Sequence, residues 1–234
     1  MAFGKKEVEM DDPFFPSQFS TLLLGSFELK TMCLFIYVFV NLSRQRRDLE
    51  SKPSFYSFVN LIISSFGGGI IVPTLLNLPI VPFNDLNITV LIAVYVFQHT
   101  FPKIVEVYRQ SVLLHFFSTI MFQAYRATVV TSVILKAISS IPPSFYDSAL
   151  FGPIFCGTIG GCGGGFMPLS KGLEPLKGGA NASVLTAFMA ATGFHIWLIK
   201  GGNEIDGKIG VSLFLIGTAL YGLYDLNKHR IKTE

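Results

Sequence analysis

Charged residues are scarce in this chain. Among its 234 residues, Lys and Arg number 18 and Asp and Glu number 15, so charged side chains make up 14%, whereas soluble domains carry about a quarter. Hydrophobic residues make up 50%, and the mean hydropathy is +0.54. A soluble fold of this length could not cover so much apolar surface. The composition excludes a soluble domain and a disordered chain, and it predicts a helical membrane protein with about six to eight spans.

Cysteines and recognisable catalytic motifs are also scarce. The three cysteines, Cys33, Cys156 and Cys162, stand in apolar stretches and form neither a disulfide framework nor a metal-binding spacing. The chain has no nucleophile elbow, phosphate-binding loop or zinc-protease motif. Its net charge of +3 is too small to indicate nucleic-acid binding. We therefore expect that the protein is not an enzyme and that it has no metal site, cofactor or nucleic-acid partner.

Seven apolar segments are interpreted as membrane-spanning helices, each of which needs about 20 residues to cross a bilayer. The predicted fold class is thus an all-α polytopic membrane protein with seven transmembrane helices. The expected spans are residues 21–42, 55–78, 85–101, 107–139, 145–169, 183–198 and 209–226.

Lys and Arg residues lie mostly on one side of these spans. Eleven of them fall in the loops after the first, third and fifth spans and in the C-terminal tail, against four on the opposite side. Positively charged loops remain in the cytosol. We therefore expect a cytosolic C-terminus and an N-terminus that is lumenal or outside, which agrees with an odd number of spans.

The second and fifth expected spans share a pattern at an offset of 96 residues. Three consecutive glycines, 67–69 and 163–165, are each followed by a proline ten residues later, Pro79 and Pro175. Because three is odd, a second unit of three spans enters the membrane from the opposite side, which makes an inverted repeat. The expected parts are a polar N-terminal segment (1–19), two three-helix repeats (20–102 and 103–200), a seventh helix (201–226) and a cytosolic tail (227–234).

Two physical interpretations fit these glycines. Small residues let membrane helices approach closely. Alternatively, consecutive glycines weaken the helix, and the freed backbone groups are tolerated only where they line water or are buried in protein. Recurrence at equivalent places favours two kinked helices that flank a permeation path. The candidate kink and pore residues are Gly67, Gly68, Gly69, Gly163, Gly164 and Gly165.

The glycine clusters, in the segments Ser65-Phe66-Gly67-Gly68-Gly69 and Gly161-Cys162-Gly163-Gly164-Gly165, resemble those of the trimeric intracellular cation channels, the TRIC family. The resemblance implies that the second and fifth helices line one pore in each subunit of a homotrimer. It also implies permeation of potassium and other monovalent cations in the endoplasmic or sarcoplasmic reticulum membrane. There the family carries counter-ions during calcium release, which limits a potential that costs about 2.3 kcal/mol per charge per 100 mV.

Charged residues inside the expected spans are further candidates, because a charge at mid-bilayer costs at least about 2.5 kcal/mol. Arg126 could line the pore or hold a phospholipid headgroup, or it could brace helix ends through their carbonyls. Animal members of the TRIC family pair this Arg with a Lys four residues earlier to bind an inositol lipid, whereas Phe122 stands at that position here. Lys136 is expected to extend to the membrane surface. Glu28 could pair with Arg126.

Two other function classes remain open. A secondary transporter also uses inverted repeats and broken helices, and Glu28 would be its acidic coupling residue. A non-conducting membrane organiser or receptor fits the lack of a soluble domain, but it does not explain the repeat. A channel is the favoured interpretation.

Overall fold

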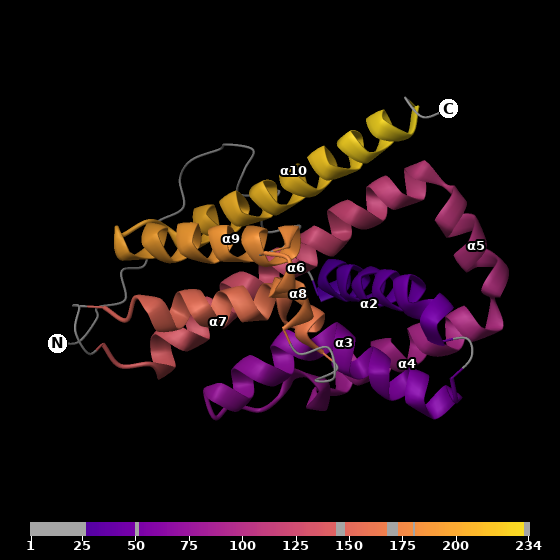
Figure 1. The fold of residues 1–234 in the computed structure, drawn as a ribbon. Coiled ribbons are helices and arrows are strands. Elements are labelled where there is room, and N and C mark those ends of the chain that lie inside the picture. Colours follow the sequence, from indigo (N-terminus) through magenta and orange to yellow (C-terminus); the bar gives the residue numbers. More distant parts are fainter. Residues whose placement is uncertain (1–26, 50–51, 144–147, 168–172, 180, 232–234) are drawn as a thin grey trace.

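The computed structural model describes residues 27–49, 52–143, 148–167, 173–179 and 181–231. Within these ranges the regular elements are all helices, so the prediction of an all-α fold is confirmed for the described part of the chain (Figure 1). Seven longer helices, one in each expected span, are α2 (Phe27–Leu49), α3 (Ser54–Leu75), α4 (Asp85–Thr100), α6 (Val112–Ser140), α7 (Phe151–Cys162), α9 (Ala182–Ile199) and α10 (Glu204–Ile231). The shorter ones are η1 (Val81–Phe83), α5 (Pro102–Gln110), η2 (Gly163–Phe166) and α8 (Glu174–Lys177).

Side-chain caps begin three of the long helices. The side chains of Asn84, Ser111 and Asn181 each accept a hydrogen bond from a backbone N–H in the first turn of α4, α6 and α9. Such a cap satisfies one of the N–H groups that a helix start leaves unpaired, which explains why these helices begin where they do.

A sharp bend separates α4 from α5. The residue before a proline avoids the helical region, and Phe101, which precedes Pro102, adopts φ −120° and ψ 62°. The two helices meet at 90°. The fourth span was expected to begin at Val107, which is wrong: Val107 belongs to α5, and α6 begins at Val112.

Helix α5 lies across one end of the bundle and connects α4 to α6 (Figure 1). Its inner face buries Val105 and Tyr108, and the Tyr108 hydroxyl lies 3.1 Å from the hydroxyl of Ser118 in α6. Arg109 donates to the carbonyl oxygen of Ser43 in α2 at 2.9 Å. These contacts fasten α5 to two of the long helices.

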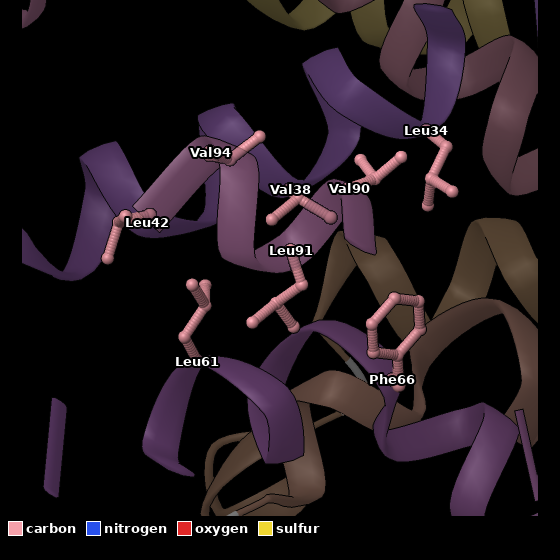
Figure 2. Close-up of a cluster of buried hydrophobic side chains, with 8 residues drawn as sticks. All are labelled: Leu34, Val38, Leu42, Leu61, Phe66, Val90, Leu91 and Val94. Atoms are coloured by element: carbon pink, nitrogen blue, oxygen red, sulfur yellow. The ribbon is translucent and has the colours of Figure 1, made fainter. Parts of the chain in front are cut away.

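One hydrophobic cluster joins α2, α3 and α4, and Leu61 of α3 and Leu91 of α4 are both fully buried in it (Figure 2). Gln98 in α4 adds a polar tie, because its amide nitrogen donates to the carbonyl oxygen of Phe39 at 2.8 Å and to the hydroxyl of Ser43 at 2.9 Å. The cluster consists of Leu34, Val38, Leu42, Leu61, Phe66, Val90, Leu91 and Val94.

A second cluster joins α6, α9 and α10. Several of its members stand 96 residues after members of the first cluster and come from the equivalent helix. The equivalent pairs are Leu34 and Val130, Val38 and Ile134, and Val94 and Ala190. The two halves of the chain therefore bury corresponding positions.

Other helix ends depart from the expected spans. Helix α2 continues to Leu49, so Arg44 is helical rather than part of a loop. Helix α7 is only 12 residues long, from Phe151 to Cys162, where a span from 145 to 169 was expected. Helix α10 runs through to Ile231, so most of the expected tail is helical. The N-terminal segment 1–19 and residues 232–234 lie outside the described residues.

Length and apolarity identify candidate spans among the described helices. Helices α3, α9 and α10 each satisfy both criteria, and the bent pair of α4 and α5 would add a fourth if it counts as one span. Helix α7 is shorter than the bilayer is thick, because 12 residues extend about 18 Å at 1.5 Å per residue.

Candidate functional site

The glycine clusters of the two repeats lie against each other. A Cβ atom added to Gly67 would lie 2.5 Å from the carbonyl oxygen of Gly163, and one added to Gly68 would lie 2.6 Å from that of Gly160. Real Cβ atoms are essentially never found within 3.0 Å of another heavy atom. Helix α3 therefore crosses α7 and η2 with backbone against backbone, which only glycine permits. We call this contact the glycine crossing.

Both helices depart from helical geometry immediately before their glycines. Phe66 adopts φ −110° and ψ 18° inside α3. Cys162 adopts φ −129° and ψ 0° at the end of α7, and the chain continues as the tight turn η2. Helical residues lie near −63° and −42°. The breaks thus fall one residue before the expected glycines, and Pro73 lies inside α3 without a second break.

The contacts of the glycine crossing are reciprocal under the offset of 96 residues. Gly68 faces the carbonyl of Gly160, and the equivalent residue Gly164 faces the carbonyl of Ser64, which is the equivalent of Gly160. At the centre of the crossing Gly67 lies against Gly163, which is its own equivalent at the offset of 96 residues. A contact in which i meets j and j meets i is the mark of a two-fold relation.

Arg126, 7% exposed, reaches the broken end of α7 from α6. Its Nε donates to the carbonyl oxygen of Gly161 at 2.7 Å, and its Nη2 donates to that of Ser183 in α9. Its Nη1 lies 3.3 Å from the side-chain oxygen of Gln123. A cation at the C-terminal end of a helix compensates the partial negative charge there. The arginine thus links α6, α7 and α9 beside the glycine crossing.

Aromatic side chains fill the place one turn before Arg126. Phe122 stacks on Tyr37 of α2, with ring centres 4.7 Å apart and planes inclined by 24°. The guanidinium of Arg44 lies 5.1 Å from the centre of the Phe122 ring, a cation–π contact. The Tyr37 hydroxyl donates to the carbonyl oxygen of Ser65, next to the break in α3, at 3.0 Å.

Polar side chains continue from the break in α3 towards the start of that helix. The Asn60 amide donates to the side-chain oxygen of Gln45 at 2.7 Å, and the Gln45 amide donates to the Ser64 hydroxyl at 2.8 Å. Sequence reasoning missed Tyr37, Gln45 and Asn60. Tyr37 and Asn60 were polar groups inside apolar expected spans, which is costly unless such groups pair or face water, whereas Gln45 lay in the expected loop after the first span and gave no such signal.

The remaining candidates lie apart from this site. A Cβ atom on Gly69 would meet the side chain of Val81 at 2.8 Å, and Gly165 is exposed in η2. Lys136 is exposed ten residues after Arg126, about 15 Å further along α6. Glu28 belongs to α2, but its side chain and any pairing with Arg126 lie outside the described residues.

The described cysteines are buried and unpaired, and within the described ranges no group of three His, Cys, Asp or Glu side chains is placed to hold a metal ion. The fold and the site thus define an all-helical membrane protein organised around two broken helices that cross at glycines.

Comparison with solved structures relates this fold to known channels. The chain matches a TRIC cation channel studied for its conductance with a TM-score of 0.66 and 16% identity, over 85% of this chain and 93% of that one. It matches a trimeric intracellular cation channel from C. elegans, solved in the absence of Ca²⁺, with a TM-score of 0.65 and 16% identity, over 88% and 94%. No family profile and no curated protein sequence matches. The resemblance inferred from the glycine segments is therefore confirmed for the fold.

Proposed function

We propose that the protein is a channel for monovalent cations, permeable to potassium, with one ion path in each subunit. The observation that carries the proposal is the glycine crossing, at which α3 and α7 both depart from helical geometry beside a buried arginine. Backbone groups freed inside a membrane must line water or be buried in protein. Two such breaks at equivalent places are typical of a permeation path.

The proposal includes seven membrane spans arranged as two inverted three-helix repeats and a seventh helix. The reciprocal contacts of the glycine crossing support it, because an offset of 96 residues exchanges them. The two hydrophobic clusters support it as well, since they use equivalent positions of α2 and α6 and of α4 and α9.

Arg126 is proposed as the residue that controls the ion path. The end of α7 carries partial negative charge that favours a cation, and Arg126 occupies that end through the carbonyl of Gly161. A permeant cation and the arginine would compete for the same carbonyl groups. A phospholipid headgroup whose phosphate pairs with Arg126 would neutralise the arginine and leave these carbonyl groups free for the cation. We propose this role for the headgroup that the sequence predicts at Arg126.

The name of one structural neighbour, a trimeric intracellular cation channel, supports our proposal for the assembly and the membrane. We propose a homotrimer in the endoplasmic or sarcoplasmic reticulum membrane, with a lumenal N-terminus and a cytosolic C-terminus as the distribution of Lys and Arg predicts. Its role there would be counter-ion flow during calcium release.

The test is a recording of the purified protein in a planar bilayer with a KCl gradient. We expect discrete current steps that reverse near the potassium equilibrium potential. Arg126→Ala should change the open probability or the unit conductance, whereas Lys136→Ala, its exposed control on the same helix, should not. Arg126→Lys keeps the charge in case the alanine variant does not fold, and it should give an intermediate change.

Other outcomes would overturn the channel. Current that reverses near the chloride potential would exclude a cation path. Saturable uptake into liposomes without current steps would favour the transporter, and loss of that uptake in Glu28→Gln would identify its coupling residue. If a folded trimer showed neither current steps nor uptake, a non-conducting organiser would be favoured.

A further inference from the structure

An apolar groove runs between α9 and α10 on the outside of the bundle, away from the glycine crossing. Its volume is about 390 Å³, and its walls are almost entirely apolar. Gly193 of α9 and Gly210 of α10 keep it open, because a Cβ atom at either position would meet nothing within 4 Å. One end of the groove is lined by Met189 and Phe214.

One end of this α9–α10 groove carries a carboxylate. Asp206 lies in the first turn of α10 and lines the groove beside Trp197 of α9. The neighbouring acid Glu204 is paired with Lys208 one turn later, so Asp206 supplies the uncompensated negative charge among these three residues. The opposite end, at Met189 and Phe214, lies about 12 Å away, eight residues along either helix.

Trp197 is held firmly at this end. Its indole Nε1 donates to the carbonyl oxygen of Asn203 at 2.8 Å. The ring packs on the backbone of α10, where a Cβ atom added to Gly207 would lie 2.9 Å from it. An aromatic ring beside a carboxylate is the combination that binds alkylammonium groups.

We propose that the α9–α10 groove binds a phospholipid of the surrounding bilayer whose headgroup carries a cation, phosphatidylcholine or phosphatidylethanolamine. One acyl chain would lie between Gly193 and Gly210, and the ammonium group would rest between Asp206 and Trp197. Both helices satisfy the criteria for membrane spans, so their outer surface faces lipid. The carboxylate near the turn between the helices disfavours an anionic headgroup and gives the groove its preference.

Trp197 is the only tryptophan in the chain, which makes its fluorescence a direct reporter of the groove. The protein would be reconstituted at equal mole fractions of brominated phosphatidylcholine or brominated phosphatidylglycerol, whose bromine atoms quench a nearby indole. We expect the wild type to prefer the choline lipid about threefold, the ratio that one exposed cation–π contact supports. Asp206→Asn should lower the preference to about one.

Two glycine variants separate the groove from the rest of the surface. Gly193→Leu would fill it and should abolish both the preference and the lipid that native mass spectrometry detects on each subunit. Gly217→Leu, on α10 where the added side chain also meets open space, does not line the groove and should keep both. Equal quenching by the two lipids in the wild type would overturn the proposal. Weak quenching by both, with subunits that dissociate in Gly193→Leu, would overturn it in favour of a second copy of the chain.

Discussion

Replacement of Gly67 by alanine tests the glycine crossing. The new Cβ atom would lie 2.5 Å from the carbonyl oxygen of Gly163 and 2.8 Å from its carbonyl carbon. Both are backbone atoms, so no side-chain rotation can relieve the clash. Ordinary contact begins at 3.4 Å. Helix α3 and η2 must therefore separate by about 1 Å in a region that is packed to crystal density.

The size of the effect follows from two opposing terms. Overpacking of this kind costs about 1–3 kcal/mol. Alanine in place of glycine inside a helix returns up to about 1 kcal/mol. We expect a net loss of about 1–2 kcal/mol, which for a chain of this size lowers the melting temperature by about 2–8 °C. Gly217→Ala in α10, where the methyl group meets nothing within 4 Å, should melt at the wild-type temperature or slightly above.

The assay is thermal unfolding of the purified protein in detergent, followed by the fluorescence of Trp197. The two alanine variants differ only in what the added methyl group touches, so the difference between their melting temperatures isolates the crossing. Should Gly67→Ala melt as high as Gly217→Ala, α3 and η2 would not be in backbone contact, and the argument for the glycine crossing would fail.

Three further substitutions test other parts of the structure. Arg126→Ala removes three hydrogen bonds, two of them to carbonyl groups of other helices, and should cost about 3 kcal/mol, whereas the exposed control Lys136→Ala should stay within about 0.5 kcal/mol. Equal midpoints in denaturant titrations would contradict this. Gln98→Leu leaves acceptors in α2 without their donor and should cost about 1–3 kcal/mol in the same titration, while an unchanged midpoint would mean that the tie is not formed. Leu91→Ala empties the centre of the first cluster and should cost about 2 kcal/mol or more by calorimetry, and a smaller loss would indicate that the cluster collapses into the space.

Much of the fold could be predicted from the apolar segments of the sequence and from its internal repeat. The glycine clusters could be related from the sequence because they recur at one offset, and α4 and α9 lie close to their expected bounds because asparagine caps begin both. The position of each break was missed by one residue. A glycine marks where another backbone can approach, and the chain bends at the residue that precedes the approach, Phe66 or Cys162.

Helix α5 and the partners of Arg126 were beyond sequence reasoning for different reasons. Only three polar residues, 109–111, separate the apolar residues of α5 from those of α6, and the sequence therefore predicts a single span that starts at Val107. The partners of Arg126 in other helices are backbone carbonyls, which every residue has and which therefore leave no signature in the sequence. The break that makes the carbonyl of Gly161 accessible exists only once α7 is folded.

The reciprocity of the glycine crossing bears on how the two halves of the chain can diverge. Away from the crossing, equivalent positions differ by a whole side chain, as Leu61 and Gly157 do, because each half repacks its own interior. At the crossing the backbones of the two halves are in direct contact, so each half fills the space that the glycines of the other half leave open. A larger residue on one side therefore requires a compensating change on the other side of the contact. Sequence change is thus independent in the flanking helices and coupled at the crossing, which keeps the two halves at the same level along the bundle.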